Sequence, residues 1–409
     1  MGDPLSNQHD VLITGLGLIS SLGEGADAHW ARLGGAGGQT DPILDDTTFA
    51  PYPVHPMVEL DLTKQIPRRG DQRQMEPWQR IGVYAAGLAL DDAGIAGETE
   101  LLDRTNLIVA AGSGERDTTM DMMLLEKVGD ETNPDITANE VLRTELRPTL
   151  FLAQLSNLLA GNISIVHKVT GSSRTFMGEE MAGLSAVEIA HRRITSGQDD
   201  LFLVGGAFNA EREDMLLILE LGRNLRRGGF KPVWERTGDG GGMVTGSVGA
   251  FLVLESRRHA EARSARVYAR LADIVSGRCN RAPGAATASA KKLFDRLDGG
   301  LSPGPLAVLS GSCGTEPAAG EELAFLQGLD ESRYQTSIRT YASVLGHSLE
   351  AHFPAGLTLA ALALSNGAFY RPFDASGVET GGADAVERIL VTGWGHWRGE
   401  GLGLIEVAD

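Results

Sequence analysis

The sequence predicts an α/β protein built from two similar halves. Apolar runs that end in glycine alternate with longer amphipathic stretches, and this order of strand, crossover helix and strand is typical of buried, mainly parallel sheets. The scheme occurs in residues 10–257 and again, more loosely, in residues 258–408, which predicts an internal duplication. The 53 glycines among 409 residues suit a core with many tight turns.

Apolar runs and glycines place the elements of the first half in order. The helix over 76–95 has the clearest pattern, because Ile81, Tyr84, Ala85 and Leu88 recur at helical spacing and a glycine follows as a stop. Strands are also expected at 11–23, 106–114, 161–171, 199–208 and 244–256, and helices at 146–162 and 181–197.

The second half follows the same alternation. Residues 345–367 predict a helix whose first part is interrupted by Pro354. Strands with glycine-rich ends are expected at 305–315, 388–397 and 401–408.

Charge and targeting patterns exclude two classes of partner. The formal net charge of −18 argues against a nucleic-acid binder, which needs a basic surface. No uncharged apolar run reaches the roughly 18 residues of a membrane span. The N-terminus lacks a signal-peptide pattern, and the two cysteines, Cys279 and Cys313, are too few for a disulfide framework. We therefore expect a cytoplasmic protein without a membrane span.

The motifs predict neither a cofactor nor a metal. Residues 11–20 contain glycines, but a serine stands where the third glycine of G-x-G-x-x-G is needed. The nine histidines form no zinc pattern, and His347 and His352 are not spaced for one helical face.

Two carboxylates, Glu179 and Glu180, stand at the entrance of the helix expected from Met181. A strand, a glycine-containing turn and a small-residue helix form a place where many enzymes hold a nucleophile. A helix N-terminus stabilises a carboxylate by about 0.3–1 kcal/mol. Glu180 is therefore either a functional residue or simply a helix cap.

Several motifs together carry a family resemblance. The ordered set resembles the β-ketoacyl-acyl-carrier-protein synthases of the thiolase superfamily over nearly the whole chain. This resemblance implies a five-layered α/β/α/β/α fold of two duplicated halves, a dimer, and decarboxylative condensation by a cysteine and two histidines. The motifs are VLITGLGLISSLG, the spacing Gly171–Thr175–Glu180–Gly197–Gly205–Gly206, GSVGAFLVLES, VLGHSLEA and LVTGWGHW.

Carried over by this resemblance, the catalytic set is broken. Glu180 stands at the position of the nucleophilic cysteine, and Cys313 stands at the first histidine. Ala342 replaces a lysine, and His347 is the retained second histidine. The last glycine turn, where the family has a gating phenylalanine and two glycines, reads Trp394, Gly395, His396, Trp397 and Arg398.

These replacements argue against condensation. An acyl group on a carboxylate is too reactive to hold a chain, and a cysteine cannot donate a hydrogen bond as an imidazole does. We expect Trp397 and Arg398 to fill the space of the thioester oxygen, and Arg398 or His347 to bond Glu180. The alternatives are that Cys313 is a small buried hydrophobe and that His347 is merely a buried histidine.

The resemblance favours a chain-length-factor-like subunit. Such subunits lack the cysteine and pair with an active ketosynthase in fatty acid or polyketide biosynthesis. The partners would be that synthase, or a second copy of the chain, and an acyl carrier protein. Two alternatives stay open. One is an enzyme of altered chemistry that uses Glu180 and His347, with Cys313 as a further candidate, such as a malonyl decarboxylase, a hydrolase or a condensing enzyme. The other is a homodimeric acyl-binding scaffold.

Two surface patterns bear on partners. The apolar run at 120–125 would lie near an acyl tunnel in a synthase dimer, or it is an ordinary core or dimer helix. Basic residues in this acidic chain could meet an acidic carrier protein, or they form a solvated face. They are Arg192, Arg193, Arg223, Arg226, Arg227 and Lys231.

Overall fold

The computed structural model describes residues 8–34, 41–129, 132–147, 150–298, 301–329, 333–380 and 385–408. Its described strands form one large sheet and a small pair, β3 (Val54–His55) with β7 (Thr245–Gly246). The first half supplies β1 (Val11–Ser20), β2 (Gly23–Glu24), β4 (Asn106–Ala111), β5 (Ser173–Met177), β6 (Leu201–Phe208) and β8 (Val248–Ser256). The second half supplies β9 (Ala269–Gly277), β10 (Gly304–Ser310), β11 (Tyr334–Thr340), β12 (Arg388–Trp394) and β13 (Glu400–Glu406).

The order of the strands shows the duplication. The path through the large sheet is β11-β10-β12-β13-β9-β1-β8-β6-β4-β5, with β2 paired to β1. With β2 left aside, each half has five strands, which can be numbered by their order in the sequence. Followed from the outer end of the sheet toward the middle, both halves have the order third, second, fourth, fifth, first. The halves join where β1 pairs with β9, over the three residue pairs from Val11↔Leu271 to Ile13↔Ala269. The exact division at 10–257 and 258–408 stays a prediction.

The expectation of mainly parallel sheets is wrong. Parallel pairing is confined to β5-β4-β6 and to β11-β10-β12, at the two ends of the path. The strands between them, from β6 through β1 and β9 to β12, pair antiparallel. For β12 and β13 the reason is the short turn at 395–399, which can join only antiparallel neighbours.

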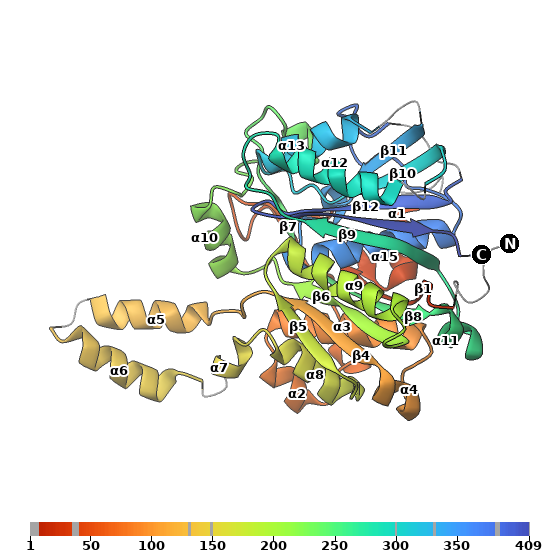
Figure 1. Cartoon of the computed structure of the whole chain (residues 1–409). Coiled ribbons are helices and arrows are strands. Elements are labelled where there is room, and N and C mark those ends of the chain that lie inside the picture. Colours follow the sequence, from red (N-terminus) through yellow and green to blue (C-terminus); the bar gives the residue numbers. More distant parts are fainter. Residues whose placement is uncertain are drawn as a thin grey trace.

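The helices complete five layers (Figure 1). The central layer holds α9 (Glu180–Thr195) and α15 (His352–Ser365), which pack against strands of both halves around one apolar core. The outer face of the first half is covered by α3 (Pro77–Asp92) and α8 (Leu158–His167). The outer face of the second half is covered by α12 (Ala285–Asp298) and α13 (Ala318–Gln327). The α/β/α/β/α prediction is therefore confirmed.

Shorter elements complete the described chain. The helices are α1 (Ala26–Leu33), α2 (Arg69–Gln74), α4 (Thr99–Arg104), α7 (Leu150–Ala153), α10 (Glu213–Leu221), α11 (Arg257–Ala262) and α14 (Ala342–Leu345). The 3₁₀ turns are η1 (Leu62–Lys64), η2 (Trp234–Arg236) and η3 (Leu349–Ala351).

Three local predictions differ from the structure. Residues 161–171 are not a strand, because 158–167 form α8 and the strand is the more polar β5 at 173–177. The expected helix at 146–162 is divided into α7 and α8. A short apolar run does not distinguish a strand from a buried helix. Pro354 does not interrupt α15 but lies in its first turn, where a missing N–H is tolerated.

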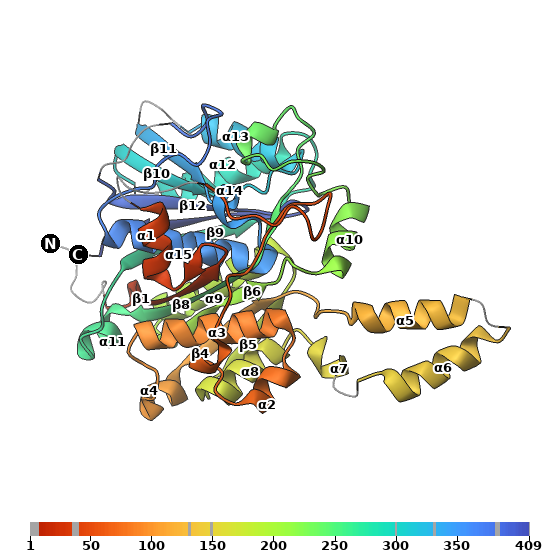
Figure 2. The ribbon, with the colours of Figure 1, turned by 180° about the vertical axis from the view of Figure 1, so that it is seen from behind.

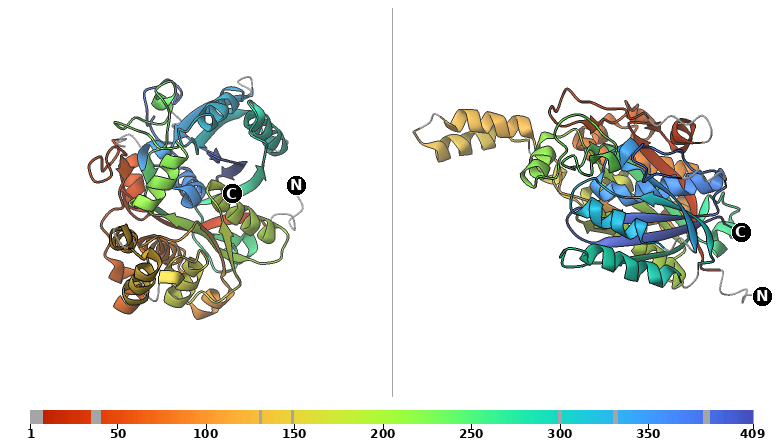
Figure 3. Two further views of the ribbon diagram at one scale, coloured as in Figure 1. Left: turned by 90° about the vertical axis from the view of Figure 1, so that its left-hand side faces the viewer. Right: turned by 90° about the horizontal axis from the view of Figure 1, so that it is seen from above.

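A helical hairpin leaves the body of the molecule. It consists of α5 (Thr118–Gly129) and α6 (Pro134–Glu145), and it extends away from the layers in Figure 2 and in the right-hand view of Figure 3. We call it the arm. Met120 is buried, but Met122 and Leu125 are more than half exposed. The reading of residues 120–125 as an ordinary core helix is therefore wrong for this chain by itself.

Within the described residues, no helix combines the length and apolarity that crossing a membrane requires.

Candidate active site

Glu180 lies at the first turn of the central helix α9, as the sequence predicts. Gly178 precedes it with φ 145°, a backbone conformation that favours glycine and that turns the chain from β5 into the helix. Glu180 is only 2% exposed. Glu179 occupies the N-cap position and makes no side-chain capping bond.

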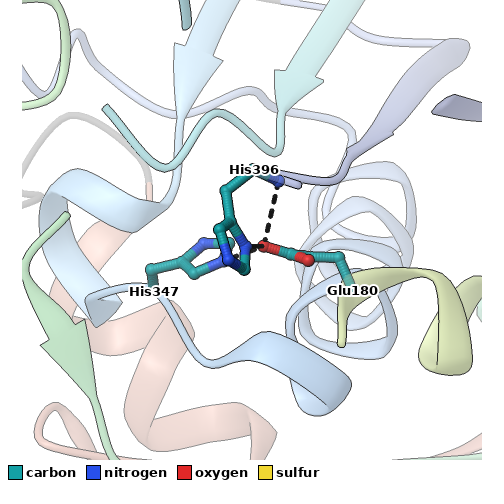
Figure 4. Close-up of side chains that lie close together, drawn as sticks. All are labelled: Glu180, His347 and His396. Carbon is teal, nitrogen blue, oxygen red and sulfur yellow. Dashed lines mark hydrogen bonds and ion pairs between the residues drawn. The ribbon is translucent and has the colours of Figure 1, made fainter. Parts of the chain in front are cut away.

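The Glu180 carboxylate is held by two histidines (Figure 4). Nε2 of His347 donates to its Oε1 at 2.8 Å, and Nδ1 of His396 donates to the same oxygen at 2.6 Å. The backbone N–H of His396 adds a weaker contact at 3.3 Å. Glu180 is therefore more than a helix cap. Arg398 pairs instead with Oε2 of Glu179, at 3.3 Å.

The charges in this cluster follow from burial and pairing. Burial raises the pKa of Glu180, but the two histidines outweigh it and hold that pKa well below its usual value. Burial lowers the pKa of His396, but the charge of Glu180 reverses this and raises it. For His347, burial dominates and lowers the pKa. The pairing therefore favours the ionised form of Glu180 and the protonated form of His396, whereas burial favours the neutral form of His347.

The backbone of His347 is fixed from both sides by the strand-like segment before β8. Its N–H donates to the carbonyl of Val244 at 2.8 Å, and its carbonyl accepts from Gly246 at 3.0 Å. Its ring lies 4.2 Å from the ring of His352, measured between centroids. The spacing of His347 and His352 does not predict contact on one helical face, but the fold places their rings in contact.

The turn between β12 and β13 brings His396 to Glu180. Gly395 and Gly399 close this turn with a 3.1 Å backbone bond, and Arg281 donates to both of their carbonyls, at 2.7 and 3.1 Å. A Cβ on Gly395 would lie 2.0 Å from the carbonyl oxygen of Arg398. The turn therefore needs glycine at this position.

The two residues after His396 do not enter the site. Trp397 is 66% exposed, and the half-exposed side chain of Arg398 reaches Glu179 at the surface. This differs from the expectation that Trp397 and Arg398 fill the inner space. Backbone direction explains the difference, because the tight turn aims one side chain inward and the next two outward.

Cys313 is a buried neutral thiol. Its Sγ accepts the N–H of Thr315 at 3.4 Å, and the side chain packs in a small apolar cluster with Leu225 and Met243. Burial, together with the charge of Glu180, raises the pKa of Cys313 to about 12. A thiol needs a depressed pKa to act as a nucleophile, so the geometry favours the reading of Cys313 as a small hydrophobe.

Two ionisable side chains near the cluster were not predicted from the sequence. Glu350 is 4% exposed, and burial raises its pKa to about 8, helped by the charges of Glu180 and Glu179. Arg236 is fully buried and donates to the carbonyls of Gly242 and Cys313, at 3.0 and 3.3 Å. Glu350 lies inside the VLGHSLEA motif, so its position in that motif could have identified it from the sequence. Nothing in the local sequence marks Arg236 as buried.

The arrangement limits the available chemistry. No thiolate is present at the Glu180 position, and the carboxylate is already bonded to two imidazoles. Such a cluster can hold or move a proton between Glu180 and a histidine. Its three ligand atoms also lie within 4.8 Å of one another, close enough for one cation to contact them all.

Comparisons with known proteins identify the family. The model of "Beta-ketoacyl synthase, N-terminal domain" matches residues 8–260, which is more than half of the chain. A 3-oxoacyl-[acyl-carrier-protein] synthase 2 of Vibrio cholerae is 26% identical over 267 residues. That alignment covers 63% of this chain and spans 61% of the relative's length.

Solved structures show the same fold. The ishigamide ketosynthase/chain length factor superposes with a TM-score of 0.76 at 20% identity, covering 98% of this chain and 99% of its own. A type II PKS acyl-carrier protein in complex with its ketosynthase (AntDE:AntF) gives a TM-score of 0.71 at 16% identity, with 98% and 99% covered. The family model and the shared five-layered fold together establish that this chain belongs to the β-ketoacyl synthase family.

Proposed function

We propose that this chain is a chain-length-factor-like subunit that assembles with an active ketosynthase in fatty acid or polyketide biosynthesis. It does not condense acyl groups by itself. The observation that carries the proposal is Glu180 at the nucleophile position, buried and bonded to both His347 and His396. A carboxylate in that state is engaged as a structural anion rather than free to attack a thioester.

The remaining positions support the same proposal. Cys313 stands where the family has its first histidine, and its neutral buried thiol can supply neither a proton nor a strong hydrogen bond to an oxyanion. His396 stands in the gating turn, and its ring fastens that turn to α9 through Glu180. A turn held against α9 by an ion pair suits a subunit that shapes a partner's site.

Two exposed features support assembly with a second subunit. The arm presents large apolar side chains to solvent, including Met122, Leu125 and Ile136, each at least 57% exposed. At the end of the large sheet, β5 has β4 as its single strand neighbour among the described residues. Exposed apolar patches and open sheet edges are typical of interfaces. The partner is an active synthase in our proposal, and a second copy of this chain is the alternative.

A carrier protein has a candidate contact beside α10. Leu217, Ile218 and Leu221 are exposed there, and the exposed Arg223 follows the helix. Other basic residues are paired with acidic residues of the chain itself: Arg192 with Glu188, Arg193 with Asp199, Arg226 and Lys231 with Asp239, and Arg227 with Glu220 of α10. We therefore place the docking of an acidic carrier protein at α10 rather than at Arg192 and Arg193. A cytoplasmic location is part of the proposal.

The test is to purify the tagged chain from its native host and identify what co-elutes by mass spectrometry. We expect a stoichiometric synthase of similar size that keeps a cysteine at the position of Glu180. A variant with Leu125→Glu in the arm should lose this partner, whereas Lys292→Glu, exposed on α12 at the outer face of the second half, should keep it. Chain extension of a carrier-bound acyl group with malonyl units by the pure chain alone would contradict the proposal.

A second candidate function is favoured by the ion pair itself. Glu180 and His396 form a charged pair that could exchange a proton with a bound malonyl or acyl group. An enzyme of this kind, a decarboxylase or hydrolase, would turn over malonyl-carrier protein, and Glu180→Gln would abolish the turnover. An inactive wild-type chain excludes this function. A scaffold that holds an acyl chain would instead carry bound lipid and no partner after purification.

A further inference from the structure

We propose that Glu180, His347 and His396 form a binding site for a divalent transition-metal ion. Among the described residues, these three side chains bring one potential ligand atom each to within 4.8 Å of one another. His347 and His396 lie 167 and 216 residues after Glu180 in the chain, so no local sequence motif marks the set. The inference concerns a property that the proposed subunit role does not require.

The type of ion follows from the donor atoms. Magnesium and calcium prefer oxygen ligands, whereas two imidazole nitrogens with one carboxylate suit zinc and its first-row neighbours. Two histidines and one glutamate are also the protein ligands of several zinc sites that leave a further position for water. We therefore assign the site to an ion of this class and take Zn²⁺ as its simplest representative.

An ion at this site replaces the hydrogens that His347 Nε2 and His396 Nδ1 donate to Glu180: one proton leaves the protonated His396, and the hydrogen of the neutral His347 moves to its Nδ1. The distances are then compatible with such an ion after a small rearrangement. Oε1 of Glu180 lies 2.8 Å from Nε2 of His347 and 2.6 Å from Nδ1 of His396. Ligand bonds of about 2.0–2.2 Å in a tetrahedron place neighbouring donor atoms roughly 3.3 Å apart. The Glu180 oxygen must therefore move about 0.5–0.7 Å away from each nitrogen, and the two nitrogens, which lie within 4.8 Å of each other, must come to the same spacing.

Each ligand is positioned by its own structural support. Glu180 begins α9, His347 is bonded through its backbone to Val244 and Gly246, and His396 lies in the turn that Arg281 holds. Because three rigid segments converge before any ion binds, little ordering is left to oppose binding. Bound there, the ion would connect α9, the segment before η3 and the β12–β13 turn.

The side of His396 is the shortest route from the surface to the cluster. Its side chain is 8% exposed, against 3% for Glu180 and 0% for His347, and the exposed Trp397 follows it in the turn. An ion would therefore reach the cluster from this side, by movement of the turn.

The test uses the full-length chain after its affinity tag is removed, because a histidine tag would bind the same ions. The protein is stripped with EDTA, exchanged into a buffer that does not bind metals, and titrated with Zn²⁺ by calorimetry. We expect one equivalent to bind. Both His396→Phe and Glu180→Gln should weaken binding by at least about 100-fold, beyond the 10–100-fold range known for residues that merely support a ligand.

A matched control is available in the first half. His259 also bonds a buried glutamate, Glu255, at 2.6 Å, but without a second histidine. His259→Gln should bind Zn²⁺ like the wild type. Substitution with Co²⁺ gives a readout that needs no activity, because visible absorption should appear for wild type and His259→Gln and be missing for His396→Phe.

Circular dichroism of the metal-free variants checks their fold, and Glu180→Gln keeps the test valid if His396→Phe does not fold. The inference is overturned if the wild type binds no stoichiometric Zn²⁺, or if neither variant changes the binding. Co-purification of a synthase is measured without metal, so its result and this one are independent.

Discussion

Replacement of Glu180 distinguishes a structural anion from a catalytic one. Oε1 accepts from the imidazoles of His347 and His396, at 2.8 and 2.6 Å, and the side chain is 3% exposed. Hydrogen bonds to a charged group contribute about 1.5–3 kcal/mol and neutral ones about 0.5–1.5. Glu180→Gln keeps the shape and removes the charge. We expect it to lower the free energy of unfolding by about 2 kcal/mol, or ~1 for each imidazole.

This loss converts to a measurable change of Tm. Unfolding entropy of roughly 2.1 cal/mol/K per residue gives about 0.9 kcal/mol/K for 409 residues, so Glu180→Gln should lower Tm by about 2 °C. Glu180→Leu leaves both histidines without their partner, which in a buried pair costs about 3–5 kcal/mol and corresponds to about 4–6 °C.

The assay is differential scanning calorimetry with EDTA present and at one protein concentration, because metal and self-association both shift Tm. Glu179→Gln is the matched control. Its carboxylate is 37% exposed and 3.3 Å from Arg398, so its removal should change Tm by less than about 1 °C. An unchanged or higher Tm for Glu180→Gln would refute the reasoning, because catalytic groups are often retained at the expense of stability.

Three further predictions address the rest of the molecule. His29 is fully buried between Ser20 and the carbonyl of Gly25, and burial lowers its pKa from 6.5 to about 4. Between pH 6.5 and 4 the unfolded chain binds a proton at this histidine and the folded chain does not, so acidification through this window should remove about 3 kcal/mol of stability. Denaturant unfolding at several pH values should show this loss for the wild type and not for His29→Gln. Parallel pH profiles of the two proteins would contradict the prediction. Phe353→Ala, in the core between the two halves, should lower the free energy of unfolding by about 3–5 kcal/mol. Urea unfolding measures this loss, with Val407→Ala at an exposed site as the control. Equal urea midpoints for the two variants would show that the central layer does not hold the halves together. Phe151 is 69% exposed at α7. Phe151→Glu should leave the Tm of the isolated chain within about 1 °C of the wild type, but it should reduce association of the chain in sedimentation velocity. Unaltered association would place the interface elsewhere.

The order of apolar runs and glycines was sufficient to predict most of the fold. The strands β1, β4, β6, β8, β10, β12 and β13 lie within the predicted ranges or within one residue of them, because buried strands are continuous apolar segments with clear ends. The α3 helix was predicted for the equivalent reason of helical periodicity. β5 was missed because it is a short, polar edge strand, and α8 was mistaken for a strand because its apolar run is short.

The sequence by itself also selected Glu180, Cys313, His347 and the turn at 395–398 as candidate site residues, since matching motifs fix positions along the chain. Only the tertiary structure decided what these residues do to one another. His396 points inward to Glu180, and Trp397 is exposed. Arg398 forms an ion pair with Glu179 rather than with Glu180, and Cys313 is buried as a neutral thiol. The physical reason is that hydrogen bonds and pKa values depend on distances of a few ångströms. Those distances are set by the packing of α9, α15 and the last two strands, which lie far apart in the sequence.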